Sequence, residues 1–396
     1  MGFYRNKFSE EKSVFAISSK SIRIMCFWLY IVLSPLNIIS VSFGWSIMKY
    51  ITLAIMFIYI LLGLSDIKIT KSFPKATWIL YILYVCFTLL WSQNIDRSFT
   101  IVLGKVETAL FALLLINDSI NKKTQKHLES AFLISGSFII AFVLFFGSLD
   151  ATSRIVINGT NVLADGNEIN TYLIMPIVVC FKRLFRKNKT GLLALAFYLA
   201  IIIASLYVCL LTGSRSGLIS LLVAIGLSIA LFNKLKIKQI VLCIVALAAI
   251  YLFVVYVALP SLPTEMLQRY SIESIVIDKG SERLMIWEIQ WNYLINNPTS
   301  MVIGYGMGGI NEFQRASHNV FLQEIVCGGF VGLFLFSLFL FSIIKHSLRQ
   351  HNLVAVIGIL SSLTIYLFLS LNSSNKATWL IFMYALYNLK EQKRTI

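Results

Sequence analysis

Apolar stretches long enough to cross a lipid bilayer recur along the whole chain and constrain the fold more than any other feature. A membrane-spanning helix needs about 20 consecutive, mostly apolar residues. Twelve such stretches can be read, at residues 24–42, 45–64, 76–92, 98–117, 128–148, 168–183, 191–212, 214–232, 238–259, 317–344, 353–371 and 375–389. A hydrophobic content of 58% and a mean hydropathy of +0.80 agree with this class. We expect an all-α polytopic membrane protein with about 12 transmembrane helices.

Basic residues are distributed unevenly over the connections between these stretches. With the N-terminus in the cytoplasm, 24 of the 34 Lys and Arg residues and only six of the 18 acidic residues fall in inner segments. This bias is the positive-inside rule, and it predicts that both termini are cytoplasmic. The rule also accounts for the net charge of +16. We expect no nucleic-acid partner, because the basic residues are spread over seven loops and do not form one stripe.

The expected spans divide the chain into five parts. They are a cytoplasmic N-terminal segment (1–23), spans one to nine (24–259), a large extracytoplasmic loop (260–315), spans ten to twelve (316–389) and a cytoplasmic tail (390–396). The large loop is predicted to be helical: Ser281 can cap a helix that should stop before Pro298. Its apolar residues have helical spacing, at Leu284, Trp287, Trp291 and Leu294. That apolar stripe could lie on the membrane surface or against the bundle.

A glycine-rich run, Gly304-Tyr305-Gly306-Met307-Gly308-Gly309, follows this helix. A nucleotide-binding loop is a poor interpretation, because no strand precedes the run and the glycine spacing differs from that motif. We expect a flexible connection through which the chain returns to the bundle.

His318 is the only one of the four histidines expected on the outer side, where it begins the tenth span. His127, His346 and His351 fall in basic cytoplasmic loops. Imidazole is the side chain whose ordinary pKa suits a neutral base near pH 7. The alternative is an interfacial histidine that donates to a backbone carbonyl. Asn319, the next residue, is a polar group able to fix the tautomer of the ring.

Two arginines are expected on the same side as His318. Arg215 lies among small residues where one span ends and the next begins, in Thr212-Gly213-Ser214-Arg215-Ser216-Gly217. It could extend to lipid headgroups or contribute to a buried anion site. Arg283 lies four residues before Trp287 and could stack on that indole. Together the two guanidinium groups could hold a pyrophosphate through bidentate hydrogen bonds.

Four other polar residues lie within or beside expected spans. Lys105 and Glu107 are inside the fourth span, where ionisable residues are functional candidates by rule. Two residues apart, they cannot face each other on a helix, so pairing with another span is the favoured role for them. Asp165 and Asn167 end the first long outer loop, and either helix capping or contact with an acceptor sugar would account for them.

No metal or other cofactor is expected from the residue inventory. The six cysteines all fall in expected spans and form no CxxC pair, so they indicate neither a disulfide framework nor a metal site. One outward histidine without an outward cysteine is too few ligands for a usual zinc site.

The order of these motifs resembles the O-antigen ligase and polymerase superfamily. The resemblance covers about residues 150–345 and rests on Thr212 to Gly217, on Arg283 with Trp287 and Asn297-Pro298, on Gly304-Tyr305-Gly306, and on His318-Asn319-Val320-Phe321-Leu322-Gln323 leading to Gly328-Gly329. Asp165-Gly166-Asn167 is similar to a family Asp-Pro-Asn motif, with glycine in place of proline.

The resemblance implies a metal-independent glycosyltransferase of the bacterial inner membrane, with its active site on the periplasmic or outer side. The donor would be a glycan on undecaprenyl pyrophosphate. By position, Arg215 and Arg283 match the family arginines that bind the donor pyrophosphate, and His318 matches the histidine that activates the acceptor hydroxyl. Asn319, Trp287, Asp165 and Asn167 would support the site or contact the acceptor. Membrane lipids and a chain-length regulator are further candidate partners.

Three functions remain open at this point. A polymerase, which the motifs resemble more, would extend a lipid-linked repeat of an O-antigen or related surface polysaccharide. A ligase would transfer the glycan to lipid A core and thereby complete lipopolysaccharide. A transporter of lipid-linked glycans is the non-enzymatic alternative, favoured by Lys105 and Glu107 but disfavoured by the long outer loop and by the lack of an internal repeat.

Overall fold

The computed structural model describes residues 19–38, 47–63, 70–149, 155–157, 166–185, 191–232, 252, 256, 260, 283–309, 317–367 and 376–390. Its helices are α1 (Ser19–Leu33), α2 (Ile47–Gly63), α3 (Phe73–Phe87), α4 (Ile95–Leu115), α5 (Lys122–Phe146), α6 (Gly166–Leu184), α7 (Leu192–Leu211), α8 (Arg215–Phe232), α12 (Arg283–Ile295), α13 (Pro298–Ile303), α14 (Val320–Arg349), α15 (Leu353–Tyr366) and α16 (Lys376–Ala385). Two 3-10 helices extend this set, η1 (Ser34–Ile38) after α1 and η3 (Thr88–Leu90) after α3.

The described strands are only two or three residues long. They are β1 (Ser119–Ile120), β2 (Gly147–Leu149), β3 (Ile155–Ile157) and β4 (Asn388–Leu389). β1 pairs with β4 in parallel, and β2 pairs with β3 in antiparallel. Among the described residues, seven helical stretches are long and apolar enough to cross a membrane. The prediction of an all-α polytopic membrane protein is therefore confirmed.

A described helix overlaps each expected span except the ninth, and that span, 238–259, lies almost wholly outside the described residues. The boundaries differ by a few residues. α1 begins at Ser19, before the expected 24, and the last helix ends at Ala385, before the expected 389. The number of spans stays a prediction, as does the division of the chain into five parts.

Asparagine begins several of these helices, because its side chain can accept a hydrogen bond from a backbone N–H that the first turn leaves unpaired. Asn94 caps α4, Asn121 caps α5, Asn297 caps α13, Asn319 caps α14 and Asn352 caps α15. Each Oδ1 atom accepts from the backbone N–H three residues later, at 2.9–3.4 Å. These starting points are therefore local properties of the sequence.

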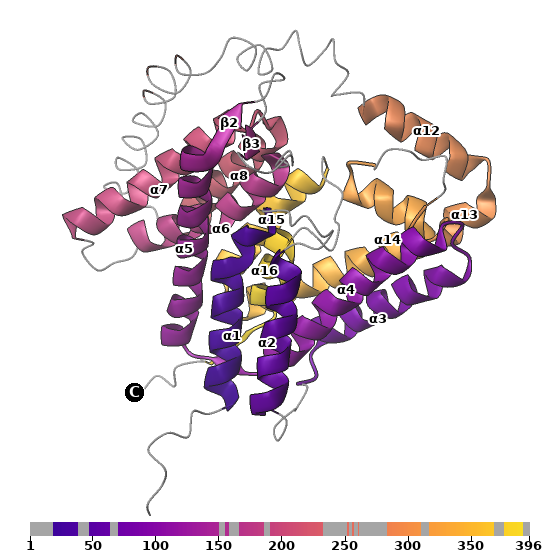
Figure 1. Cartoon of the computed structure of the whole chain (residues 1–396), viewed down its shortest axis with the longest axis horizontal. Coiled ribbons are helices and arrows are strands. Elements are labelled where there is room, and N and C mark those ends of the chain that lie inside the picture. Colours follow the sequence, from indigo (N-terminus) through magenta and orange to yellow (C-terminus); the bar gives the residue numbers. More distant parts are fainter. Residues whose placement is uncertain are drawn as a thin grey trace, which may run out of the picture.

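α6 is buried on nearly every side and forms the centre of one part of the bundle (Figure 1). It packs against α5, α7, α8, α15 and α16. Its approach to α5 is close because Gly136 lies against Pro176, where a Cβ atom would overlap the proline ring. On the other side of Figure 1, α3 and α4 lie with α14, and α13 and α12 follow at the end of that group.

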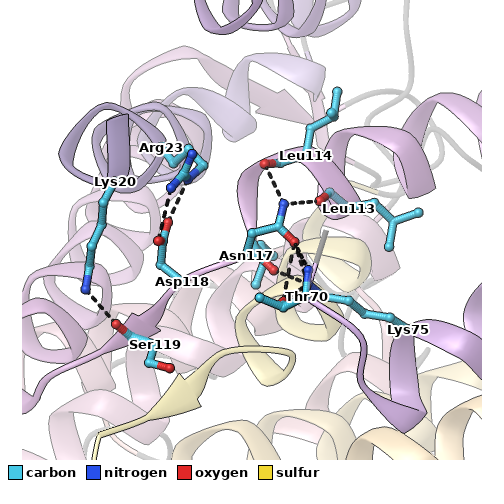
Figure 2. Close-up of polar contacts among 10 residues, drawn as sticks. Lys20, Arg23, Thr70, Lys75, Leu113, Leu114, Asn117, Asp118 and Ser119 are labelled. Atoms are coloured by element: carbon cyan, nitrogen blue, oxygen red, sulfur yellow. Dashed lines mark hydrogen bonds and ion pairs between the residues drawn. The ribbon is translucent and has the colours of Figure 1, made fainter. Parts of the chain in front are cut away.

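Polar side chains at one end of the bundle connect α1, α3 and the turn between α4 and α5 (Figure 2). Arg23 donates to both carboxylate oxygens of Asp118, at 2.7 and 3.1 Å. The buried Lys75 donates to Asn117 Oδ1 at 2.8 Å and to the carbonyl of Ile116. The charge pattern assigns all of these segments to the cytoplasmic side, so their contact agrees with the expected alternation of the helices.

The same end also gathers the segments around the later helices. The β1–β4 pair joins the α4–α5 turn to the residues after α16. Gln350, between α14 and α15, accepts from the backbone of Leu389 at 2.8 Å. Lys182 at the end of α6 pairs with Glu129 of α5 at 2.6 Å.

The opposite end carries the connections predicted to be outside. Asn37, after α1, donates to Glu168 at the start of α6 at 2.8 Å. Ser98 at the start of α4 accepts from the backbone N–H of Gly308 at 2.7 Å. Which of the two ends faces the cytoplasm stays a prediction.

Candidate functional site

α14 is interrupted at Gly329, and this break shapes the site. Gly329 has φ +64° and ψ −168°, which no helix allows, so α14 consists of a short half-helix, 320–328, and a long half-helix, 330–349. A Cβ atom at Gly329 would overlap the carbonyl of Val302 in α13. The apolar run 317–344 predicts one continuous span, and the structure differs because glycine allows this close approach of two backbones.

The glycine-rich turn fills the break in α14. In a continuous helix, the carbonyls of Val326 and Cys327 would accept from residues 330 and 331. Here they accept from the backbone N–H groups of Tyr305 and Gly306, each at 2.9 Å. Residues 304–309 are all buried. The expectation of a flexible connection was therefore wrong: the run is a packed element whose glycines let backbone approach backbone.

His318 immediately precedes the short half-helix. Its backbone has φ +49°, a left-handed conformation that is uncommon outside glycine, although histidine is among the residues that adopt it more often. Asn319 caps the half-helix through Leu322, so its amide is committed to the backbone. His318 is half-buried. Its position on the outer side of the membrane stays a prediction.

Trp287 connects the loop helix α12 to the segment of His318. Its Nε1–H donates to the carbonyl of Ser317 at 2.7 Å, and Ser317 is buried. Arg283 is the first residue of α12, one turn before Trp287 and on the same face. The structure therefore brings Trp287, one turn after Arg283, next to the residue that precedes His318.

α12 ends at Ile295, before Pro298, as expected, and its apolar stripe is only partly packed against the bundle. The buried residues are Ile286, Gln290 and Leu294, at intervals of four. Of the predicted apolar stripe, Leu284 and Trp291 are exposed. α12 is apolar on most of its circumference, so spacing alone could not decide between the membrane surface and the bundle for this stripe. The predicted cap, Ser281, lies outside the described residues.

Arg215 begins α8 within a compact polar turn. Asn167 of α6 accepts from the hydroxyls of Ser214 and Ser216, the two neighbours of Arg215, the second at 2.8 Å. Ser214 also caps α8, because its Oγ accepts from Gly217 N at 3.0 Å. Asn167 thus fixes the backbone on both sides of Arg215, and we call Asn167, Ser214, Arg215 and Ser216 the Arg215 turn.

Gly217 explains why α6 can approach this turn so closely. A Cβ atom at Gly217 would overlap the side chain of Asn170, which is fully buried and donates to Thr212 Oγ1 at 3.0 Å. Asp165, the other polar residue expected near this turn, lies outside the described residues.

The candidate residues therefore form two groups. One joins Arg283, Trp287, Ser317, His318 and Asn319 at the junction of α12 and α14; the other is the Arg215 turn, between α6 and α8. In Figure 1, α12 lies well apart from α8, and α15 packs against both α8 and α14. The joint action of Arg215 with Arg283 stays a prediction.

Sequence reasoning placed Lys105 in a pair with another span but did not find its partner. Lys105 of α4 forms a 3.0 Å ion pair with Glu324 in the short half-helix of α14. Tyr81 of α3 contacts both residues. The sequence narrowed the choice without deciding it, because Glu107 is too close in sequence to Lys105. Three other acidic residues lie inside the expected spans: Glu129, Glu168 and Glu324.

Comparison with known proteins gives one match in this region. A search of curated proteins returns none. Residues 199–337 match the sequence model of a family described as O-Antigen ligase. The matched stretch holds both arginines, the loop helix, the glycine-rich turn, His318 and the break in α14, and it confirms the resemblance found in the sequence. On this match, residues 199–337 belong to the O-antigen ligase and polymerase superfamily.

Proposed function

We propose that this protein is a metal-independent membrane glycosyltransferase that polymerises oligosaccharide repeats carried on undecaprenyl pyrophosphate. The family match supports transfer of a lipid-linked glycan in O-antigen biosynthesis. The contact between Trp287 and Ser317, at 2.7 Å, carries the assignment of the site. It holds Trp287, one turn after Arg283, against the residue that precedes His318.

The proposed reaction moves the growing glycan from its lipid carrier to a new repeat. A hydroxyl oxygen of the acceptor sugar attacks C1 of the donor sugar, and a C–O bond forms there. The bond between C1 and the phosphate oxygen breaks, and undecaprenyl pyrophosphate leaves with both electrons. The proton of the hydroxyl passes to the imidazole of His318, which acts as general base.

Arg215 and Arg283 are proposed to bind the pyrophosphate of the donor. A guanidinium group offers a planar pair of donors that matches phosphate oxygens, and it stabilises the charge that develops on the leaving group. Asn167 would act through Arg215 by holding its turn in place. This assignment requires the Arg215 turn and the α12–α14 junction to reach the same pyrophosphate when the donor is bound.

The proposal includes a location in the cell inner membrane, with twelve spans, cytoplasmic termini and a periplasmic or external active site. The grouping of the connections between helices at two opposite ends of the bundle supports this topology. Segments assigned to the cytoplasm by their charge gather at one end of the bundle, around Arg23, Asp118 and the β1–β4 pair. Those assigned to the outside gather at the other end, with His318.

The test compares two histidine variants in the purified full-length protein, supplied with lipid-linked repeats in nanodiscs. His318→Ala should lower the rate of chain elongation by about 100-fold or more, the usual contribution of a general base. His351→Ala is the matched control, because His351 also has a left-handed backbone but lies exposed in the α14–α15 turn at the opposite end. Elongation by His318→Ala at the wild-type rate would rule out the assignment of the base.

The ligase is the second candidate, because the matched family is described as O-Antigen ligase. A ligase would use lipid A core as its acceptor. Gene deletion separates the two. Loss of a polymerase leaves single repeats on lipid A core, whereas loss of a ligase leaves the core bare and long polymer on the lipid carrier. A chain-length regulator is a proposed partner only of the polymerase.

A transporter was favoured by Lys105 and Glu107, and the pairing of Lys105 with Glu324 gives the first of them a structural role instead. Product formation by the purified protein without any ion gradient would exclude transport as the principal activity.

A further inference from the structure

A buried charged cluster lies inside the membrane-spanning part, where α3, α4 and α14 meet. Lys105 Nζ lies 3.0 Å from Glu324 Oε1 and donates to the Tyr81 hydroxyl at 2.6 Å. The Tyr81 hydroxyl donates in turn to the same oxygen of Glu324, at 2.8 Å. The exposed fractions of these residues are 2% or less. We call these three residues the Tyr81–Lys105–Glu324 cluster.

Stability alone does not account for such a cluster. Removing two charges from water costs about as much as their attraction returns, so apolar residues of similar volume often stabilise a fold equally well or better. Ionisable residues inside a membrane are therefore uncommon unless they serve a function. Both donors also converge on one carboxylate oxygen, Oε1, while Oε2 has no hydrogen-bond partner among the described residues. The cluster fixes the direction of Glu324 through a single atom.

Glu324 belongs to the short half-helix that begins at the Asn319 cap, directly after His318. The break at Gly329 separates this half-helix from the rest of α14, so the long half cannot hold it in register through helical hydrogen bonds. Near the break its hydrogen-bonded anchors are carbonyl groups: Val326 and Cys327 accept from the glycine-rich turn, and Gly328 accepts from Tyr84 at 2.6 Å. Val326 also packs with Leu294 and Tyr305. Glu324, one turn earlier, is the side chain that ties the middle of the half-helix to α3 and α4.

We propose that Lys105 and Tyr81 are positioning residues that act through Glu324 to hold the His318-bearing half-helix in the orientation needed for transfer. The inference rests on the proposed function, because it takes His318 as the base. The cluster does not contact the substrate. It sets the angle of the short half-helix relative to the bundle, and with it the place of the imidazole.

The experiment uses the full-length protein in nanodiscs and compares Lys105→Met with the double variant Lys105→Met/Glu324→Gln. Lys105→Met leaves a buried carboxylate without its counter-charge. The double variant removes both charges and keeps the Tyr81 hydroxyl bonded to an amide oxygen. Lys182→Met is the matched control, since it removes an ion pair with Glu129 at the other end of the bundle.

Two quantities are measured for each variant: hydrogen exchange of the backbone amides in residues 320–328, and the kcat and KM of elongation. Lys105→Met should raise exchange in this segment and lower kcat by about tenfold or more, with KM for the acceptor unchanged. The double variant should recover both to within about threefold of wild type. Lys182→Met should change neither quantity.

Each result decides a separate question. Unchanged kcat in a folded Lys105→Met variant would overturn the positioning role, even if exchange rose. A wild-type protein that makes no polymer would instead refute the proposed function, while exchange would still report whether the cluster holds the half-helix. If Lys105→Met does not fold, Tyr81→Phe decides, since it keeps the ion pair and the ring. It should lower kcat about 3- to 10-fold, and an unchanged kcat would overturn the proposal.

Discussion

Replacement of Gly329 by alanine tests whether the break in α14 is needed for the site. Gly329 lies at φ +64° and ψ −168°, in a region that only glycine occupies readily. The added methyl group would also overlap the carbonyl of Val302, a backbone atom that cannot rotate away. Alanine favours a continuous helix at this position, and that helix would withdraw the Val326 and Cys327 carbonyls from the glycine-rich turn.

The size of the effect follows from the backbone conformation. A residue held in such a region costs about 1–3 kcal/mol, which is roughly a 5- to 150-fold change in an equilibrium constant. The overlap with the Val302 carbonyl adds to this cost, so we expect an effect above the lower end of this range. We expect Gly329→Ala to lower the rate of elongation at least tenfold and to lower the melting temperature of the purified protein.

Gly226→Ala is the matched control for the same chemical change. Gly226 lies inside α8, and a Cβ atom there would meet nothing within 4 Å. Alanine in a helix interior is favoured over glycine by about 0.5–1 kcal/mol. Gly226→Ala should therefore leave elongation unchanged and leave the melting temperature equal or slightly higher. Both variants are assayed in the same nanodiscs, with the same lipid-linked repeats.

A Gly329→Ala protein that elongates and melts like wild type would refute this reasoning. It would mean either that α14 is continuous in the working enzyme or that the packing of the glycine-rich turn has no influence on His318. Loss of stability without loss of elongation would assign the break to folding alone.

Two further predictions concern the arginines and their supports. Trp287→Phe keeps an aromatic ring but leaves the buried carbonyl of Ser317 without its donor, at a cost of about 1–3 kcal/mol; elongation should fall about 5-fold or more, and a wild-type rate would detach α12 from the site. In a double-mutant cycle, Arg215→Ala and Arg283→Ala should couple by at least about 0.5 kcal/mol in kcat/KM, because both bind one pyrophosphate. Strict additivity in that cycle would place the two arginines at separate sites.

Much of the fold follows from local features of the sequence. Apolar length located every described span, because a bilayer demands long apolar helices whatever their tertiary contacts. The starts of three helices also follow from neighbouring residues alone, because an asparagine cap depends only on the next three residues. These starts are at Asn94, Asn121 and Asn352. The charge pattern also sorted the connections into an inner and an outer set. In the structure, members of each set contact other members of the same set.

Features that depend on contacts between distant segments could not be predicted in this way. The break at Gly329 looks like any glycine within an apolar run, and only the approach of Val302 in α13 shows why it is needed. The contact that α12 makes through Trp287 could not be predicted either, because its partner, Ser317, is 30 residues away in sequence. The partner of Lys105 was likewise 219 residues away.

The candidate site combines these two kinds of information. The sequence singled out His318 as the only histidine expected on the outer side, and it singled out Arg215 and Arg283 by their order among the motifs that resemble the family. It could not show that His318 stands on a half-helix separated from the rest of its span. A helix broken within a membrane must find new partners for its released carbonyls, because lipid supplies none. The glycine-rich turn and Tyr84 are those partners. The residues that satisfy the break therefore also determine where His318 lies, so substitutions remote from substrate should affect catalysis at this site more strongly than they affect substrate binding.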